Sequence, residues 1–507
     1  MNASSRTQVV IIGAGPTGLS LAVQLLRYHI DFVIIERNLA TTPLSKAVVI
    51  QARTLEIFRE VGLDDKAIAA GRFTTAMNMY YKGKRKIRLS LAGLGDGLSQ
   101  FPFALSLEQS KTEKLLADYL SEKGHAIQWG CEFIRLEQKE VVSVYYKNAN
   151  GEEQRIEAGY VVGCDGAGSL VRHQMGLAFE GDTIPKMFYV ADIKLSSPVI
   201  NQDELFIFLI KKGFALFFPM EGTGHYRMIG VLPDKKEDDA FSFDDIAGPV
   251  KEQMDIPVSF EEVRWFSSYK VHSRKAGSFL NGRCFIAGDA AHIHTPAGGQ
   301  GMNTGIQDAY NLAWKLAYTI NGYAAGFVLD SYSTEREENA RQLLRTTDKM
   351  FDMMTGAARF WNFFRLHIFP LIAGALSRSP LIRKRFFPLL SQTGIAYPGS
   401  SITIKSGLGK VRAGDRMHYF VLPDGSNIFD HLTAPAFKIL FFGTGKSDFD
   451  QLKEIKFPLI YLSFDYIPEK IFGDSADFYV LLRPDNHVSY IGKDVQDCEL
   501  LLNRLSG

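Results

Sequence analysis

The stretch that decides the fold is QVVIIGAGPTGLSLAVQLLRYHIDFVIIERN, residues 8–38. It predicts a strand, a glycine turn, a helix and a second strand, because two β-branched runs flank apolar residues at helical spacing. Gly13, Gly15 and Gly18 form a GxGxxG pattern in the turn, and Glu36 ends the second strand. Such glycines admit a pyrophosphate to the helix N-terminus, and such an acid binds a ribose hydroxyl. The stretch therefore predicts a dinucleotide site, for FAD or NAD rather than NADP.

Two further apolar strands run into glycine turns later in the chain. YVVGCDGAGSLVRHQMG, residues 160–176, places Asp165 directly after a strand. GDAAHIHTPAGGQGMNTGIQDAYNLAWKLA, residues 288–317, opens on another such turn and has glycine at three of the four positions from Gly298 to Gly301. Glycine lets backbone N–H groups approach a ligand, and the helix that follows directs its positive end to the same place. Helix capping alone does not explain three such turns in one chain.

The three turns resemble the fingerprints of the single-component (class A) FAD-dependent aromatic hydroxylases, the group of p-hydroxybenzoate hydroxylase and phenol hydroxylase. The match runs from about Val9 to Glu338, and GDAAH at residues 288–292 is its most specific part. It implies an α/β fold with a Rossmann-like FAD/NAD(P)-binding domain, an inserted antiparallel β-sheet substrate domain and a C-terminal thioredoxin-like domain. The cofactor-binding residues that the turns and the resemblance imply are Gly13, Gly15, Pro16, Thr17, Gly18, Glu36, Arg37, Arg53, Gln109, Asp165, Arg172, Gly288, Asp289, Pro296, Gly299, Gly301, Met302 and Asn303.

The resemblance also implies what several of these residues do. Glu36 is expected to hold the adenosine ribose of FAD, and Asp289 its ribityl chain. Asp165 and Arg172 are expected to shape the pyrophosphate region. The backbone of residues 299–303 is expected to face the pyrimidine edge of the flavin, where N–H groups stabilise negative charge without adding a competing acid.

Two positions on predicted helices carry more than one interpretation. Gln109 matches a glutamine that contacts the flavin in the family, and Ser110 with Glu113 predicts a capping box for the helix that begins there. Arg53, within QARTLEIF, matches a family position near the cofactor. An arginine on a helix surface is the alternative interpretation of Arg53.

The resemblance implies a monooxygenase that uses NAD(P)H and O2 to hydroxylate a phenolic or polycyclic aromatic substrate through a C4a-hydroperoxyflavin. Phenol hydroxylases of this type carry an aspartate that helps to ionise the substrate, and this chain has Val48 at that position. The substrate is therefore expected to be acidic already or to be ionised by another group. The catalytic residue stays unknown, with Tyr226 and His225 as candidates from their place on the middle sheet.

Two alternatives to aromatic hydroxylation use the same flavin. One is epoxidation or Baeyer–Villiger insertion on a non-aromatic substrate. The other is a membrane-associated quinone or lipid hydroxylase, because residues 351–392 are apolar and basic with one acid. The stripes AMNMYY (76–81) and FALFFPM (214–220) fit either core strands or the roof of a substrate cavity. His292 and His294 lack an evident third ligand, so we expect no metal site there.

Changes in sequence pattern along the chain divide it into four parts. Residues 186–277 alternate apolar and polar positions, as an antiparallel sheet with one covered face does. GTGKS, residues 443–447, lacks the first glycine of a phosphate-binding loop and predicts a surface turn. The predicted domains are a FAD-binding domain (1–185 and 278–350), a substrate sheet (186–277), a helical connector (351–398) and a thioredoxin-like domain without CxxC (399–507).

The composition is that of an ordinary globular protein of 507 residues. It is 46% hydrophobic and 22% charged with a formal net charge of +1, which gives no support to a nucleic-acid partner. Four cysteines without a CxxC motif suggest a reducing compartment, and the N-terminal sequence has no signal-peptide pattern. We therefore expect a cytoplasmic enzyme whose C-terminal domain acts as a scaffold or supports a homodimer.

Overall fold

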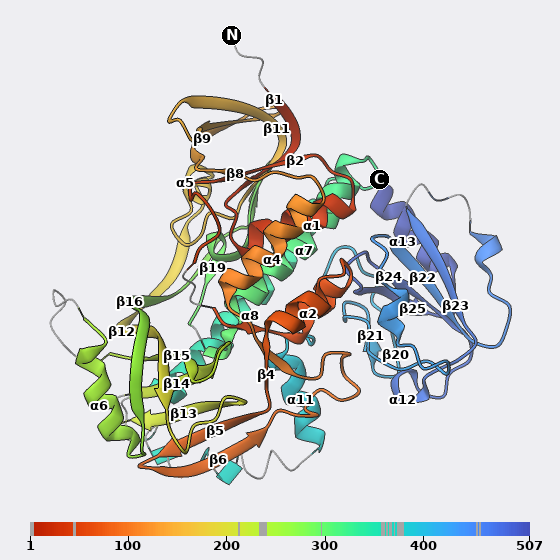
Figure 1. Ribbon diagram of the computed structural model, residues 1–507. Helices are drawn as coiled ribbons and strands as arrows, with labels where there is room; N and C mark the ends of the chain where they lie inside the picture. The colour runs from red at the N-terminus through yellow and green to blue at the C-terminus, as the bar shows by residue number, and fades with distance from the viewer. Residues whose placement is uncertain are drawn as a thin grey trace.

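The computed structural model contains two large sheets and a C-terminal domain, which Figure 1 shows in blue beside α1 and α2. It describes residues 5–43, 47–210, 213–232, 241–295, 297–355, 380–452 and 458–507, together with residues 360, 363–364, 368–369, 371–372 and 455.

The first sheet has the order β17-β18-β11-β1-β2-β8, and β18, β11, β1, β2 and β8 run parallel. Val9–Ile12 are buried β-branched residues, as expected for a parallel strand covered on both faces. β9 and β10 extend the sheet with antiparallel pairing. The strands are β1 (Ser5–Ile12), β2 (Phe32–Glu36), β8 (Gln128–Trp129), β9 (Glu132–Gln138), β10 (Val142–Lys147), β11 (Glu153–Gly163), β17 (Leu280–Asn281) and β18 (Cys284–Ile286).

Helices α1 (Pro16–Arg27), α4 (Gln109–Glu122) and α7 (Gly301–Ile320) pack with this sheet. Pro16 occupies the first turn of α1, where its missing N–H has no helical partner to lose. The strand–turn–helix–strand predicted for residues 8–38 is therefore confirmed. The neighbouring elements are α2 (Ala52–Arg59), α3 (Asp64–Ala70), α5 (Leu170–Gln174), α8 (Phe327–Thr355) and a small sheet of β3 (Val49–Ile50), β4 (Arg72–Thr74) and β7 (Ala104–Ser106).

The second sheet has the order β19-β16-β12-β15-β14-β13-β5-β6 and is antiparallel except for the pair of β13 and β5. It reaches beyond the predicted boundaries of 186–277, because residues 76–90 supply two of its strands and β12 begins before residue 186. A parallel pairing between distant segments leaves no local sequence signal. The strands are β5 (Ala76–Tyr81), β6 (Lys84–Ser90), β12 (Phe179–Ser196), β13 (Glu204–Ile210), β14 (Gly213–Pro219), β15 (His225–Val231), β16 (Ser259–Ala276) and β19 (His292–Ile293).

Alternate residues of this sheet face opposite sides. Tyr80 belongs to the cluster that packs on α6 (Asp244–Met254), whereas Met79 belongs to the cluster on the other face. The stripes at 76–81 and 214–220 are thus strands of one sheet, and each contributes to both faces.

The C-terminal domain is built on a four-stranded mixed sheet of order β23-β22-β24-β25. β22 runs parallel to β23 and antiparallel to β24, and residues 443–447 form a bend after β22. Trp314 and Tyr318 of α7 share a core with this sheet, so the C-terminal domain covers one side of α7. Its elements are β20 (Gly407–Leu408), β21 (Val411–Arg412), β22 (Phe437–Phe442), β23 (Leu459–Phe464), α12 (Glu469–Phe472), β24 (Phe478–Leu482), β25 (Val488–Gly492) and α13 (Gln496–Ser506).

The predicted connector of residues 351–398 includes the end of α8 and α11 (Pro380–Leu390). Most residues between these helices, on which the membrane-surface alternative depends, lie outside the described residues. Over the part of the chain that the structure describes, no helix has the length and hydropathy needed to cross a membrane. The four cysteines are free thiols.

Candidate cofactor site

Three glycine turns meet at one edge of the first sheet, because they follow the adjacent parallel strands β1, β11 and β18. A Cβ on Gly13 would lie 2.5 Å from the Cys164 carbonyl oxygen, so the first turn touches the second. A Cβ on Gly288 would lie 2.4 Å from Thr17 Oγ1, so the third turn touches α1. Both glycines also have positive φ, of 104° and 61°. The carboxyl ends of such strands are where open α/β sheets bind ligands.

A cavity of about 350 Å³ opens at this edge. Its wall includes six of the residues predicted to bind the cofactor, which come from β1, β2, α4 and the turn after β11. These six are Gly13, Gly15, Glu36, Arg37, Gln109 and Asp165.

Glu36 ends β2 and is buried at the base of this cavity. One carboxylate oxygen accepts a hydrogen bond of 2.7 Å from the Ala14 N–H in the first glycine turn. The other oxygen accepts hydrogen bonds from the Asn38 backbone and side-chain amides. The Glu36 carboxylate thus fixes the first glycine turn. Its predicted contact with a ribose would be made from this position.

The capping box predicted from Ser110 and Glu113 is wrong, because Glu108 occupies the N-cap and makes no side-chain cap. Glu113 instead lines the cavity and accepts hydrogen bonds from Gln109 Nε2 and the Thr42 N–H. Burial raises the pKa of the Glu113 carboxyl. Sequence reasoning missed this residue as part of the cavity wall.

Asp165 and Arg172 hold the second turn together. Asp165 accepts hydrogen bonds from Ser169 Oγ and the Val171 N–H. Arg172 is buried and donates to the Ala167 and Ala290 carbonyl oxygens. Arg172 therefore ties the second turn to the third, and its side chain is not among the residues that line the cavity.

The side chain of Asp308, on α7, holds the third turn in place. Asp308 accepts a hydrogen bond of 2.9 Å from the Gly288 N–H and pairs with Arg336 and His292 at 2.6 and 2.7 Å. Although burial opposes ionisation, Arg336 and His292 lower the pKa of Asp308. Asp289 is exposed between buried Gly288 and Ala290. Asp308 and Arg336 were not predicted, because their partners lie far away in sequence.

The N-terminus of α7 follows the glycine-rich loop, as predicted. Gly298 and Gly299 have φ of 79° and 63°, and α7 begins at Gly301. The Thr304 N–H bonds to the Gln300 carbonyl oxygen, so the earlier N–H groups of the first turn have no helical partner. Met302 lies in this first turn, and Pro296 lies outside the described residues.

Asn303 closes the base of the same loop. Its amide donates to the Val49 and Gly299 carbonyl oxygens and accepts from the Gln51 N–H and Thr54 Oγ1. The Asn303 side chain therefore holds the loop against residues 49–54.

The imidazoles of His292 and His294 form hydrogen bonds with different partners. His292 Nε2 bonds to Asp308, whereas His294 Nδ1 donates to the Thr295 carbonyl oxygen at 2.6 Å. Burial lowers the pKa of His294 to about 4. His294 Nε2 has no hydrogen-bond partner among the described residues, and a Cβ on Gly301 would lie 3.3 Å from it.

Arg53 is neither at the cavity nor on the helix surface. Its side chain is 2% exposed and forms an ion pair of 3.1 Å with Glu56. It also donates to the Asp485 carbonyl oxygen in the C-terminal domain. The guanidinium thus joins two domains, which neither interpretation of Arg53 anticipated.

Tyr226 does not fit the acid–base role predicted for it. Its ring packs in the cluster on the α6 face of the second sheet, and burial raises its pKa to about 12. The adjacent residue Arg227 faces the other way, donates to the Ala47 carbonyl oxygen and forms a two-fold ion pair of 2.7 Å with Asp192. Adjacent residues of a strand face opposite sides of the sheet, so Tyr226 and Arg227 point to different faces.

His225 lies at the rim of this region, beside Arg227 and Asp192. All three line a second cavity of about 220 Å³ that also includes Lys111 of α4. His225 Nε2 lies 3.1 Å from the Arg264 guanidinium, and burial with that charge lowers the pKa of the imidazole.

The cavity and its surroundings fit an FAD. The glycine turns leave room that a Cβ would fill, Glu36 lines the cavity, and the first N–H groups of α7 have no helical partner among the described residues. A family model described as "FAD binding domain" matches residues 6–347.

Known proteins agree with this fit. The 6-methylpretetramide 4-monooxygenase of Streptomyces rimosus is 34% identical over 342 residues, which are 67% of this chain and 61% of that protein's length. The pentachlorophenol 4-monooxygenase of Sphingobium chlorophenolicum is 30% identical over 357 residues, 70% of this chain and 66% of that protein. The solved structure of OxyS anhydrotetracycline hydroxylase from Streptomyces rimosus superposes with a TM-score of 0.80 at 27% identity, covering 99% of both chains.

Proposed function

The chain belongs to the family of FAD-dependent aromatic hydroxylases, and from this premise we propose that it uses NAD(P)H and O2 to hydroxylate a phenolic or polycyclic aromatic compound. The observation that carries the proposal is the meeting of three glycine turns and the α7 N-terminus at one sheet edge. Two relatives named for polycyclic and chlorinated phenolic substrates support this substrate class.

FAD would lie along this edge. When bound, FAD takes electrons from NAD(P)H and activates O2 for transfer to an electron-rich ring. Glu36 would hold the ribose end, and Asp289 would bind the ribityl chain from its exposed position. The free N–H groups at the start of α7 would stabilise negative charge on the flavin. The Gly288 N–H is already committed to Asp308 and holds the turn instead.

The substrate would lie between the FAD and the face of the second sheet that carries Arg227. This face is lined by apolar and aromatic side chains, and Val48 follows the Ala47 carbonyl to which Arg227 donates. The ion pair of Arg227 and Asp192 reaches the residue next to Val48, because Arg227 donates to the Ala47 carbonyl oxygen. We assign to Asp192 the ionising role that the phenol hydroxylase aspartate has at the position of Val48.

The test uses the purified protein and a panel of electron-rich phenols and polycyclic phenols. FAD released by denaturation should be stoichiometric, a good substrate should stimulate NAD(P)H oxidation, and the product should gain one oxygen from labelled O2. Insertion next to a carbonyl or across a double bond would show the Baeyer–Villiger or epoxidase alternative instead. Folded protein that binds no FAD would refute the proposal.

Three finer features belong to the same proposal. The mixed order β23-β22-β24-β25, with a final antiparallel hairpin, supports a thioredoxin-like C-terminal domain. Free cysteines support a cytoplasmic location. The predicted homodimer is tested by the mass of the purified protein in solution.

A further inference from the structure

The loop between β24 and β25, residues 483–487, is buried against the FAD-binding domain. Arg483, Asp485 and Asn486 are each at most 1% exposed. Asn486 adopts a φ of 60°, which turns the chain sharply between the two strands. Polar residues in a hairpin loop are normally solvated, so their complete burial requires hydrogen-bond and ion-pair partners.

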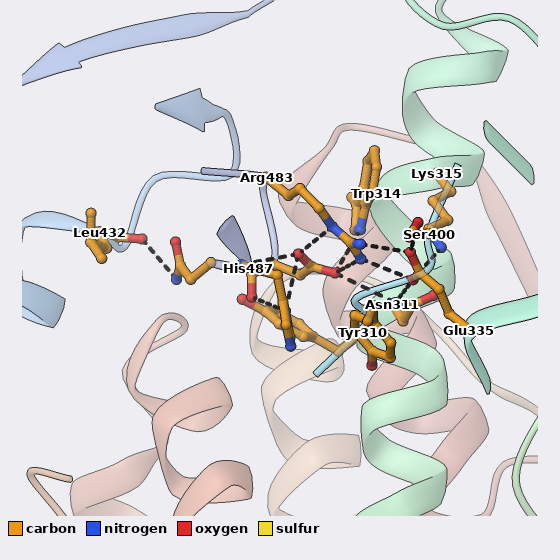
Figure 2. Close-up of polar contacts among 12 residues, drawn as sticks. Tyr310, Asn311, Trp314, Lys315, Glu335, Ser400, Leu432, Arg483 and His487 are labelled. Carbon is orange, nitrogen blue, oxygen red and sulfur yellow. Dashed lines mark hydrogen bonds and ion pairs between the residues drawn. The ribbon is translucent and has the colours of Figure 1, made fainter. Parts of the chain in front are cut away.

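The partners come from α7 and α8, and Figure 2 shows how they converge on Arg483. Arg483 binds Glu335 of α8 through two hydrogen bonds of 2.6 and 3.0 Å. Lys315 of α7 donates to the same carboxylate at 2.8 Å. Trp314 Nε1 donates to Asp485 at 3.1 Å, so the loop contacts both helices.

The charges in this cluster balance. Arg483 and Lys315 carry two positive charges, Glu335 and Asp485 carry two negative charges, and every one of these side chains is at most 1% exposed. Although burial opposes ionisation, Arg483 and Lys315 lower the pKa of Glu335 to about 2. A balanced buried cluster has one well-paired geometry, because displacing a member leaves an uncompensated charge.

The cluster continues to the third glycine turn. Arg336 follows Glu335 on α8 and donates to Asp308 at 2.6 Å and to the Thr304 carbonyl oxygen at 3.2 Å. Asp308 in turn accepts from the Gly288 N–H. Two adjacent residues of α8 therefore link the C-terminal loop on one side to the turn beside Asp289 and the first turn of α7 on the other.

We infer that the loop of residues 483–487 is part of the support of the flavin site, with Arg483 and Asp485 as positioning residues that set α7 and α8 against the third glycine turn. The C-terminal domain thereby acts on the cofactor without touching it and without redox chemistry of its own. The inference rests on the proposed function in taking FAD as the ligand of that turn.

The test compares Arg483→Met with Phe472→Leu in the full-length holoenzyme. Phe472 is a suitable control, since it is 1% exposed and packs with Phe420, Phe442 and Phe478 in a cluster that, among the described residues, includes none from α7 or α8. Arg483→Met is expected to raise the FAD dissociation constant about 2- to 30-fold and to shift the absorption spectrum of the retained flavin. Phe472→Leu is expected to lower Tm while leaving the FAD dissociation constant and spectrum as in the wild type.

The isosteric variant Asp485→Asn serves if Arg483→Met does not fold. If the FAD dissociation constant and spectrum of Arg483→Met, or of Asp485→Asn in its place, equal those of Phe472→Leu, the inference is overturned and the interface is purely structural. Wild-type protein that binds no FAD would instead refute the proposed function, so the two failures are distinguishable.

Discussion

Gly305 lies in the middle of α7, where helix propensity and packing predict opposite effects of a methyl group. Replacing a helical glycine by alanine normally stabilises a protein by about 0.5–1 kcal/mol. A Cβ on Gly305 would, however, lie 2.3 Å from Thr17 Oγ1 and 3.3 Å from Gly288 Cα. Overpacking of this kind costs about 1–3 kcal/mol. Gly305→Ala is therefore expected to destabilise the protein by about 1–2 kcal/mol and to weaken FAD binding, because α7 moves from α1 and the third turn.

A double-mutant cycle isolates the steric clash between a Cβ on residue 305 and Thr17 Oγ1. Thr17→Ala removes Oγ1 and should restore the stabilising sign of Gly305→Ala, whereas Thr17→Ser keeps Oγ1 and should not. The assay is the urea midpoint of the apoprotein followed by tryptophan fluorescence, with the FAD dissociation constant measured by flavin quenching. A stabilising effect of Gly305→Ala in the wild-type background, or equal effects in the Thr17→Ala and Thr17→Ser backgrounds, would refute the packing argument.

Four other substitutions test the site. Asp289→Ala should raise the FAD dissociation constant roughly tenfold to hundredfold by removing a charge-assisted hydrogen bond of about 1.5–3 kcal/mol, while a fall in Tm with unchanged FAD affinity would make Asp289 a turn residue only. The unfolded state binds a proton to His294 near pH 6.5 and the folded state only near pH 4, so up to about 3 kcal/mol of stability should be lost as the pH falls through this window. His294→Gln should flatten that loss in urea unfolding at pH 7, 5 and 4, and an unchanged profile would contradict it. Asp192→Asn should lower kcat/KM most for weakly acidic phenols, whereas Tyr226→Phe should leave it unchanged; the reverse pattern would return the acid–base role to Tyr226.

The glycine turns could be predicted because their signal is local. A buried β-branched strand, a glycine at fixed spacing and a helix follow one another within about twenty residues in each turn, as residues 8–38 show. The parallel register then brings the three turns together without further information. Glu36 of the cavity wall was found from the same local signal, whereas Gln109 was found from the family resemblance.

The supports of the site could not be predicted in this way. Asp308 resembles any polar residue of an amphipathic helix until the fold places it under Gly288. Arg53 reaches a carbonyl that is 432 residues away in the chain. The side to which Tyr226 points depends on which face of β15 turns to the FAD-binding domain, and a pattern of period two does not specify that face.

The pairing of β5 with β13 has a consequence for recombination between relatives. The second sheet is built from four separate stretches, residues 76–90, 179–231, 259–276 and 292–293. A chimera that exchanged only residues 186–277 would set a foreign β13 against the host's β5 and break a parallel ladder of six residue pairs. If this sheet sets substrate preference as proposed, we expect a chimera to transfer that preference only when the hairpin of β5 and β6 is exchanged together with the rest of the sheet.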